Sequence, residues 1–150
     1  MATTPNYSWV MPDPTDLVTD LPADFEIFGD AVDATVYTID QEVDTTRTTS
    51  TLNAQTASYT LVLGDAGKTI TMSVASANDL TVPPNSSVAF ATGTMINVIQ
   101  IGAGQTTLVA GAGVTVNSKS GNLKITGQYS GVSLYKRDTN TWVAIGDLSA

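Results

Sequence analysis

Three short segments carry residue types that could support catalysis. Gly67-Lys68-Thr69 matches the end of a phosphate-binding loop, but Val62 stands where the motif needs a glycine, and the following residues alternate like a strand. Gly102-Ala103-Gly104 begins like a dinucleotide fingerprint, and a hairpin turn explains it better because the third glycine and the helix are missing. Ser133 and Lys136 have the spacing of a serine–lysine acyl-transfer pair, yet a strand would point them to opposite faces.

Carboxylates are the remaining candidates for acid–base chemistry. The chain has no cysteine and no histidine, which removes thiolate nucleophiles and the commonest general base and metal ligand. Asp65, Asp79 and Asp138 fall in or beside predicted turns, and a glycan hydrolase that uses two of them is one alternative function. The acidic residues nearer the start are not spaced as a calcium loop. We therefore expect no enzymatic activity, no cofactor and no metal site.

Charge divides the chain into two parts. Ten of the fourteen acidic residues lie within positions 1–44, which contain no Lys or Arg, whereas positions 45–150 hold all six basic residues. The net charge of −8 is therefore −10 followed by +2. The scattered basic residues form no patch for phosphates, and no apolar run is long enough to span a membrane. We expect a thin acidic arm and a compact head that bind neither nucleic acid nor the membrane interior.

The arm begins with an extended segment, residues 1–19, in which prolines disfavour a helix. Its large apolar side chains favour a peptide that docks on a partner protein over a disordered tail. The residues predicted to make the docking contacts are Tyr7, Trp9, Val10, Met11 and Leu17.

Residues 20–44 have the pattern of an amphipathic helix, with Asp20 as its N-cap and Pro22 in its first turn. Apolar residues recur at spacings of four and three, interrupted by Gly29, and form a narrow coiled-coil seam: Phe25, Val32, Val36, Ile39 and Val43. A lone helix with so narrow a stripe is marginal in water. β-branched residues at both seam positions favour a parallel homotrimer, with a dimer, a pentamer, or a monomer whose helix packs on its own head as alternatives.

The head is predicted to be an antiparallel β-sandwich or barrel over residues 58–150, joined to the helix by an extended Thr-rich connector over 45–57. Turn residues separate short segments of alternating polarity, which predict strands at 58–63, 69–74, 79–82, 87–91, 95–101, 106–110, 114–117, 122–126, 132–137 and 141–146. Alternation predicts a core made of Ile96, Val98, Leu108, Val114, Val116, Leu123, Ile125, Leu134, Trp142 and Ile145. The fold class is thus mainly β with an N-terminal helical arm.

Several segments resemble proteins of tailed-bacteriophage virions. The β-rich segments Ser58–Leu63, Thr81–Phe90, Ile96–Thr107 and Trp142–Leu148 are similar to a module of head fibres, decoration proteins and tail fibres. The opening Asn6-Tyr7-Ser8-Trp9, followed by Pro12-Asp13 and Thr15–Val18, is similar to virion-attachment segments of phage structural proteins. Here Val10-Met11-Pro12-Asp13-Pro14 departs from the more regular proline–aspartate pattern of that group.

The resemblance implies a capsid decoration, cement or head-fibre protein, made in the host cytoplasm and placed on the capsid surface. It implies the major capsid protein, or another virion protein, as the partner of the N-terminal segment. It also implies a projecting head for which a host-surface glycan is a candidate ligand. A small tail-fibre or receptor-binding protein is the alternative within the same group.

Overall fold

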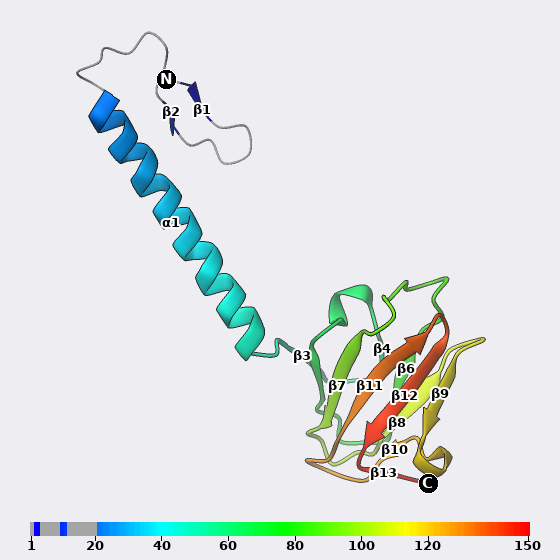
Figure 1. Cartoon of the computed structure of the whole chain (residues 1–150). Coiled ribbons are helices and arrows are strands. Elements are labelled where there is room, and N and C mark those ends of the chain that lie inside the picture. Colours follow the sequence, from blue (N-terminus) through cyan, green and yellow to red (C-terminus); the bar gives the residue numbers. More distant parts are fainter. Residues whose placement is uncertain (1, 4–9, 12–20) are drawn as a thin grey trace. The chain divides into compact units, whose positions relative to one another are not determined.

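The computed structural model describes residues 2–3, 10–11 and 21–150, with side chains described over 25–43 and 49–150. The chain divides into two compact units, Met1–Thr49 and Ser50–Ala150, and each is described by itself below. The described residues form one α-helix and two mixed β-sheets besides a short strand pair, so the prediction of a mainly β protein is confirmed (Figure 1).

The first unit contains a two-stranded pair and the helix. Strands β1 (Ala2–Thr3) and β2 (Val10–Met11) are antiparallel, and the helix α1 (Leu21–Thr48) has 28 residues. Pro22 lies in the first turn of α1, where its missing N–H removes no helical hydrogen bond. Threonine hydroxyls within the helix donate back to carbonyls four residues earlier, as Thr35 does to Ala31 over 2.8 Å. Elongating an existing helix is easy, and α1 accordingly continues four residues past its predicted end.

Six strands at the start of the second unit alternate between two sheets. Strands β3 (Leu52–Gln55), β5 (Thr69–Met72) and β7 (Met95–Gln100) lie in a six-stranded sheet, and β4 (Tyr59–Thr60), β6 (Asn78–Val82) and β8 (Thr106–Ala110) lie in a five-stranded sheet. Within each sheet these strands are parallel neighbours in chain order. The chain therefore winds through three coils of a parallel β-solenoid, and each coil adds one strand to both sheets.

Antiparallel strands close the far end of the solenoid. In the six-stranded sheet, β11 (Gly131–Asp138) pairs antiparallel with β7 and with β12 (Thr141–Gly146), while β9 (Thr115–Ser118) pairs parallel with β12. In the five-stranded sheet, β10 (Lys124–Ile125) pairs antiparallel with β8 and with β13 (Leu148–Ser149). The parallel coils account for about half of each sheet.

The prediction of an antiparallel sandwich or barrel was therefore right for the pairs β7–β11, β11–β12, β8–β10 and β10–β13, but wrong for the strands of the three coils, which are parallel. It assumed that parallel neighbours need helical crossovers, and the head sequence has no helical pattern. In the solenoid the crossover is made by a strand of the opposite sheet, so β6 connects β5 to its parallel neighbour β7. The strand and its flanking turns span the distance between two parallel strands, which a helix spans in other folds.

The connector predicted over 45–57 is also replaced. Residues 45–48 belong to α1, and β3 occupies Leu52–Gln55 in the first coil. The strand predicted over 87–91 is a loop in which Phe90 is buried, and the strand predicted over 58–63 is reduced to Tyr59–Thr60 before the 3₁₀ turn η1 (Leu63–Asp65). A second 3₁₀ turn, η2 (Lys119–Gly121), follows β9.

In the first coil, strand β3 points polar side chains inward, whereas the corresponding strand of the next coil, β5, points aliphatic ones inward. Asn53 of β3 donates to the Asp65 carboxylate over 2.8 Å, and Gln55 donates to the Asn53 side chain over 2.7 Å. The next coil contributes Ile70 and Met72, both fully buried. A terminal solenoid coil has no neighbour on one side, so polar inward residues let it meet water while the next coil shields the core.

The core lies between the two sheets. Of the residues predicted for it, Ile96, Val98, Leu108, Ile125, Leu134 and Trp142 are buried, and Val114, Val116 and Leu123 pack against them partly buried. Ile145 is 63% exposed, so its assignment to the core was wrong. It lies on β12 one residue after buried Ala144, and strand alternation places it on the outer face. The remaining core residues are Leu61, Ile70, Met72, Leu80, Val82, Phe90, Val132 and Ala144.

Two glycines allow the coils to stack. Gly102 and Gly104 lie in the turn from β7 to β8, directly against the backbone of residues 74–76 in the preceding coil. The Gly104 amide donates to the Val74 carbonyl over 2.9 Å. A Cβ at Gly104 would overlap the Ser76 carbonyl. The segment Gly102–Gly104, predicted to be a hairpin turn, is thus a turn within a solenoid coil. Its first and last positions admit only glycine.

Replacing Gly104 with alanine should separate the second and third coils locally. We expect Gly104→Ala to lower the free energy of unfolding by about 2–3 kcal/mol, because the backbone must move to admit the methyl group. Gly64→Ala is the control, since a Cβ at Gly64 meets nothing within 4 Å. Urea unfolding of both variants measures the difference, and equal stabilities would contradict the stacking argument.

Candidate functional site

Among the described carboxylates, Asp65 is the buried one, with 1% of its surface exposed, and burial of this kind can alter the reactivity of a carboxylate. Its oxygens accept hydrogen bonds from Asn53 Nδ2 at 2.8 Å, from Tyr59 OH at 3.0 Å and from the Val62 amide at 2.8 Å. Burial raises the pKa of Tyr59, and the Asp65 carboxylate raises it further, while the hydrogen bond from Asn53 lowers it. Three donors from β3, β4 and the approach to η1 occupy this carboxylate, so it holds the first coil together.

The other carboxylates of the head are exposed. Asp147 accepts from Ser130 Oγ and from Thr126 Oγ1, each at 2.7 Å, and these bonds hold its pKa below the ordinary aspartate value. Asp138 accepts from the amide of Thr139 at 2.7 Å. Within the described residues, no group of three His, Cys, Asp or Glu side chains is placed to hold a metal ion.

The segments that resemble catalytic motifs take other structures. Thr69 begins the strand β5, so Gly67 is followed by a strand and not by the helix that phosphate binding needs. Ser133 donates to Asn97 on the neighbouring strand over 2.6 Å, whereas Lys136 is buried on the opposite face of β11. The prediction that Ser133 and Lys136 point apart is confirmed.

Burial of Lys136, at 2% exposure, is a feature that the sequence pattern did not indicate. Its ammonium donates to Asn85 Oδ1 and to the Phe90 carbonyl, each over 2.6 Å, and lies 5.9 Å from the centre of the Trp142 ring. Phe90 meets the same ring edge to face at 5.5 Å. Lys136 therefore fixes the loop between β6 and β7 over the core, because a buried ammonium needs such partners. The signal that could have revealed it is the position of Lys136 two residues after the predicted core residue Leu134, on the same face of the strand.

The predicted docking residues lie mostly outside the described residues. Tyr7, Trp9 and Leu17 belong to segments that the structure does not describe. Val10 and Met11 form β2, in register with Thr3 and Ala2.

The predicted oligomer seam lies within the described part of α1. Phe25 is 60% exposed, Val36 56%, Ile39 47% and Val43 42%, and Val32 is half-buried. Successive helix residues turn by about 100°, so these five positions share one side of the helix. The stripe remains an exposed apolar surface within the chain as described. Ile27 and Tyr37 are exposed on other sides of the helix.

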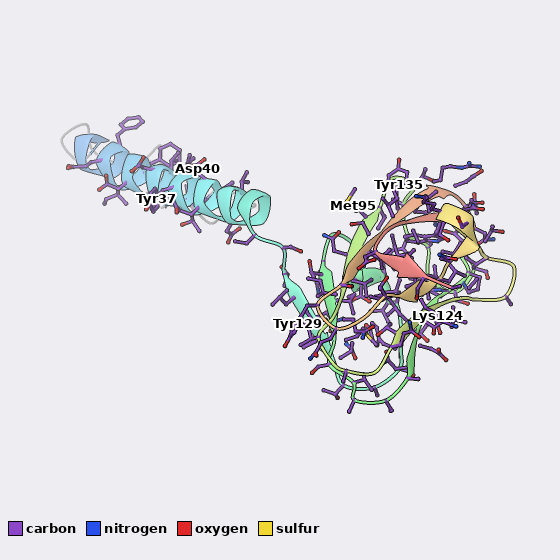
Figure 2. All side chains as sticks on the ribbon, turned by 90° about the horizontal axis from the view of Figure 1, so that it is seen from below. Tyr37, Asp40, Met95, Lys124, Tyr129 and Tyr135 are labelled. Carbon is purple, nitrogen blue, oxygen red and sulfur yellow. The ribbon has the colours of Figure 1, made fainter. Side chains whose placement is uncertain are left out.

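Acidic residues flank the stripe, mostly on one side. In heptad notation Gly29, Val36 and Val43 occupy position a, and Phe25, Val32 and Ile39 occupy position d. Position e, next to d, is acidic in all three heptads: Glu26, Asp33 and Asp40. Position g holds Phe28, Thr35 and Glu42. Figure 2 shows Tyr37 and Asp40 projecting from the helix. The stripe is thus bordered by three acidic residues on its e side and by one, Glu42, on its g side.

Comparisons with protein-family models, curated proteins and solved structures find no match to this chain. Among the described residues, no helix is both long and apolar enough to cross a membrane.

Removing the Asp65 carboxylate tests whether its role is structural. We expect Asp65→Ala to lower the free energy of unfolding by about 3 kcal/mol, because Asn53, Tyr59 and the Val62 amide lose their acceptor. Asp79→Ala is the matched control: Asp79 is exposed, and we expect a change within about 0.5 kcal/mol. Denaturant unfolding measures both, and a cost at Asp79 equal to that at Asp65 would argue against the network.

Proposed function

We propose that this chain is a non-enzymatic structural protein that self-associates through α1 and displays its β head. The observation that carries the proposal is the exposed stripe of Phe25, Val36, Ile39 and Val43. Burying such side chains is worth about 1.5–3 kcal/mol each, and in proteins most of the stability of a helix comes from packing its apolar face. A second copy offers the same stripe, so self-association covers both at once.

Charge favours a parallel arrangement of the copies. In a parallel coiled coil, position g of one helix faces the following position e of its neighbour, so Phe28 faces Asp33 and Thr35 faces Asp40. In an antiparallel pair, position e faces position e, and the acidic residues would oppose one another: Glu26, Asp33 and Asp40. Like charges held together are destabilising, and the parallel register avoids them.

The side chains of the seam favour three copies. Val36 and Val43 at position a and Val32 and Ile39 at position d are all β-branched. β-branched residues at both positions shift the preference from two strands toward three or more. We therefore propose a parallel homotrimer, whose three N-terminal segments would act together as one attachment with added avidity.

The attachment point follows from the resemblance of the sequence to phage virion proteins. We propose a capsid decoration or head-fibre protein whose residues 1–19 dock on the major capsid protein or another virion protein. The two-unit organisation suits this role, because Met1–Thr49 carries the attachment and association segments while Ser50–Ala150 forms a separate folded head. A small tail-fibre or receptor-binding protein would use the same parts at another place on the particle.

A charge placed in the stripe should dissociate the trimer. We expect the wild-type protein to sediment as three chains of 15.6 kDa at micromolar concentration and Val36→Asp to sediment as one, because burying a carboxylate in an apolar seam is strongly unfavourable. Tyr37→Asp is the matched control, being adjacent, similarly exposed and off the stripe. A monomeric wild type, or equal masses for both variants, would overturn the proposal.

The place of attachment is tested on whole particles. We expect a gold-labelled chain added to purified virions that lack it to be seen over the whole capsid by electron microscopy. The control is a chain with Trp9→Ala and Leu17→Ala, which removes two predicted docking contacts and should reduce the label. Label confined to the tail tip would refute decoration in favour of a receptor-binding protein, and no label on any part would refute virion attachment.

A further inference from the structure

A groove of about 510 Å³ opens where β9 ends beside β12. Its lining includes Asn117, Lys119, Ser120 and Asn122 from β9, η2 and the following residue, and Val143 and Ile145 from β12. The strands β9 and β12 are parallel, with Asn117 opposite Val143 and Ser118 opposite Ala144. Because β9 ends at Ser118, no strand continues the pairing beside Ile145, which leaves this side chain 63% exposed.

Hydrogen bonds fix the rim of the groove. The Ser118 hydroxyl donates to the Asn122 carbonyl, and Asn122 Nδ2 donates to the Leu148 carbonyl at 3.4 Å, which joins the residue after η2 to β13. Ser120 has φ 61°, in the left-handed region that non-glycine residues rarely adopt. Such strain is kept where surrounding structure determines it and often marks a binding site.

The lining combines an apolar floor with neutral polar groups and one charge. Val143 and Ile145 are apolar, Asn117 and Asn122 present amides, and Lys119 is the single charged side chain of the lining. The register of β11 and β12 places Tyr135, which is 37% exposed, directly opposite Val143. Figure 2 shows Tyr135 beside Met95, its partner on β7. The apolar floor therefore continues across the sheet toward an aromatic ring.

These features indicate a ligand with an apolar face, several hydroxyls and one negative charge. The volume lies in the range of small-ligand sites, about 300–1,000 Å³. A purely apolar ligand would make no hydrogen bond to the Asn117 amide, and a phosphate chain needs more than one cation. A sugar ring has an apolar face for Val143 and Ile145 and hydroxyls for the amides, and a carboxylate on it would meet Lys119.

We infer that this groove binds a saccharide residue that carries a carboxylate. The inference deepens the proposed display of the head by giving it a ligand class and a place. It depends on no residue of α1, so the two proposals can fail independently. The wild-type protein and Val36→Asp should bind alike per chain, because the groove lies wholly within Ser50–Ala150.

The test uses the full chain with labelled isoleucine methyl groups, titrated with a glucuronate-containing tetrasaccharide and with a neutral glucose tetrasaccharide. We expect the Ile145 methyl resonance to shift with the first probe, while that of Ile125, buried in the core, stays in place. Affinity for the neutral probe should be about tenfold weaker, because it lacks the carboxylate that pairs with Lys119.

Two exposed lysines give the matched variants. Lys119→Gln should weaken binding of the charged probe about tenfold, whereas Lys124→Gln, on β10 of the other sheet, should leave it unchanged. Sedimentation and thermal unfolding of each variant confirm that assembly and fold are retained. An unmoved Ile145 methyl, equal affinity for both probes, or equal effects of the two substitutions would overturn the inference.

Discussion

The head depends on the stacking of one coil of backbone on the next. No strand of β3 to β8 finds its hydrogen-bond partner in the strand that precedes or follows it; each pairs with a strand one full coil away. A single coil therefore satisfies neither its peptide groups nor its inward side chains. This constraint accounts for the glycines at 102 and 104, for aliphatic residues at Ile70 and Leu80, and for antiparallel strands at the far end, where no fourth coil continues.

The arm poses the opposite problem, since a helix satisfies its own peptide groups internally. What α1 leaves unsatisfied is its apolar side, with Val36 and Ile39 about half exposed. The two units thus differ in what they need from outside. The head buries a core of apolar residues between its own sheets, whereas the stripe on the helix stays largely exposed in the described chain. This difference underlies the proposed division between association and display.

Local pattern predicted the elements and much of the core. The four–three spacing located the helix, and alternation located β7, β8, β11 and β12 together with core residues such as Ile96 and Trp142. Strand direction was not predictable in this way, because alternation is the same in parallel and antiparallel sheets. Strand β3 of the first coil was missed because Asn53 and Gln55 face inward, and a polar interior hides a strand from a search for apolar alternation.

The candidate sites likewise differ in whether a local sequence pattern could predict them. The seam could be found because a helix displays its pattern along one chain segment, whereas the groove combines β9, η2, β12 and β13, whose proximity depends on the complete sheets. Ile145 marks the limit most clearly: the sequence pattern assigned it to the core, but it lies on the outer face of β12, and the pairing with β9 ends one residue before it, at Ala144. Lys136 shows the reverse, a charged residue type at an inward position.

The modular winding of the head has an evolutionary consequence. Each coil contacts only the coils beside it, so duplication of a stretch equivalent to β5 and β6 would add one strand to each sheet without altering the polar first coil or the antiparallel end. Lengthening would place the groove farther from the first coil while leaving its lining intact. A lineage carrying this fold could thereby change its reach by copying a short gene segment, with no new tertiary architecture.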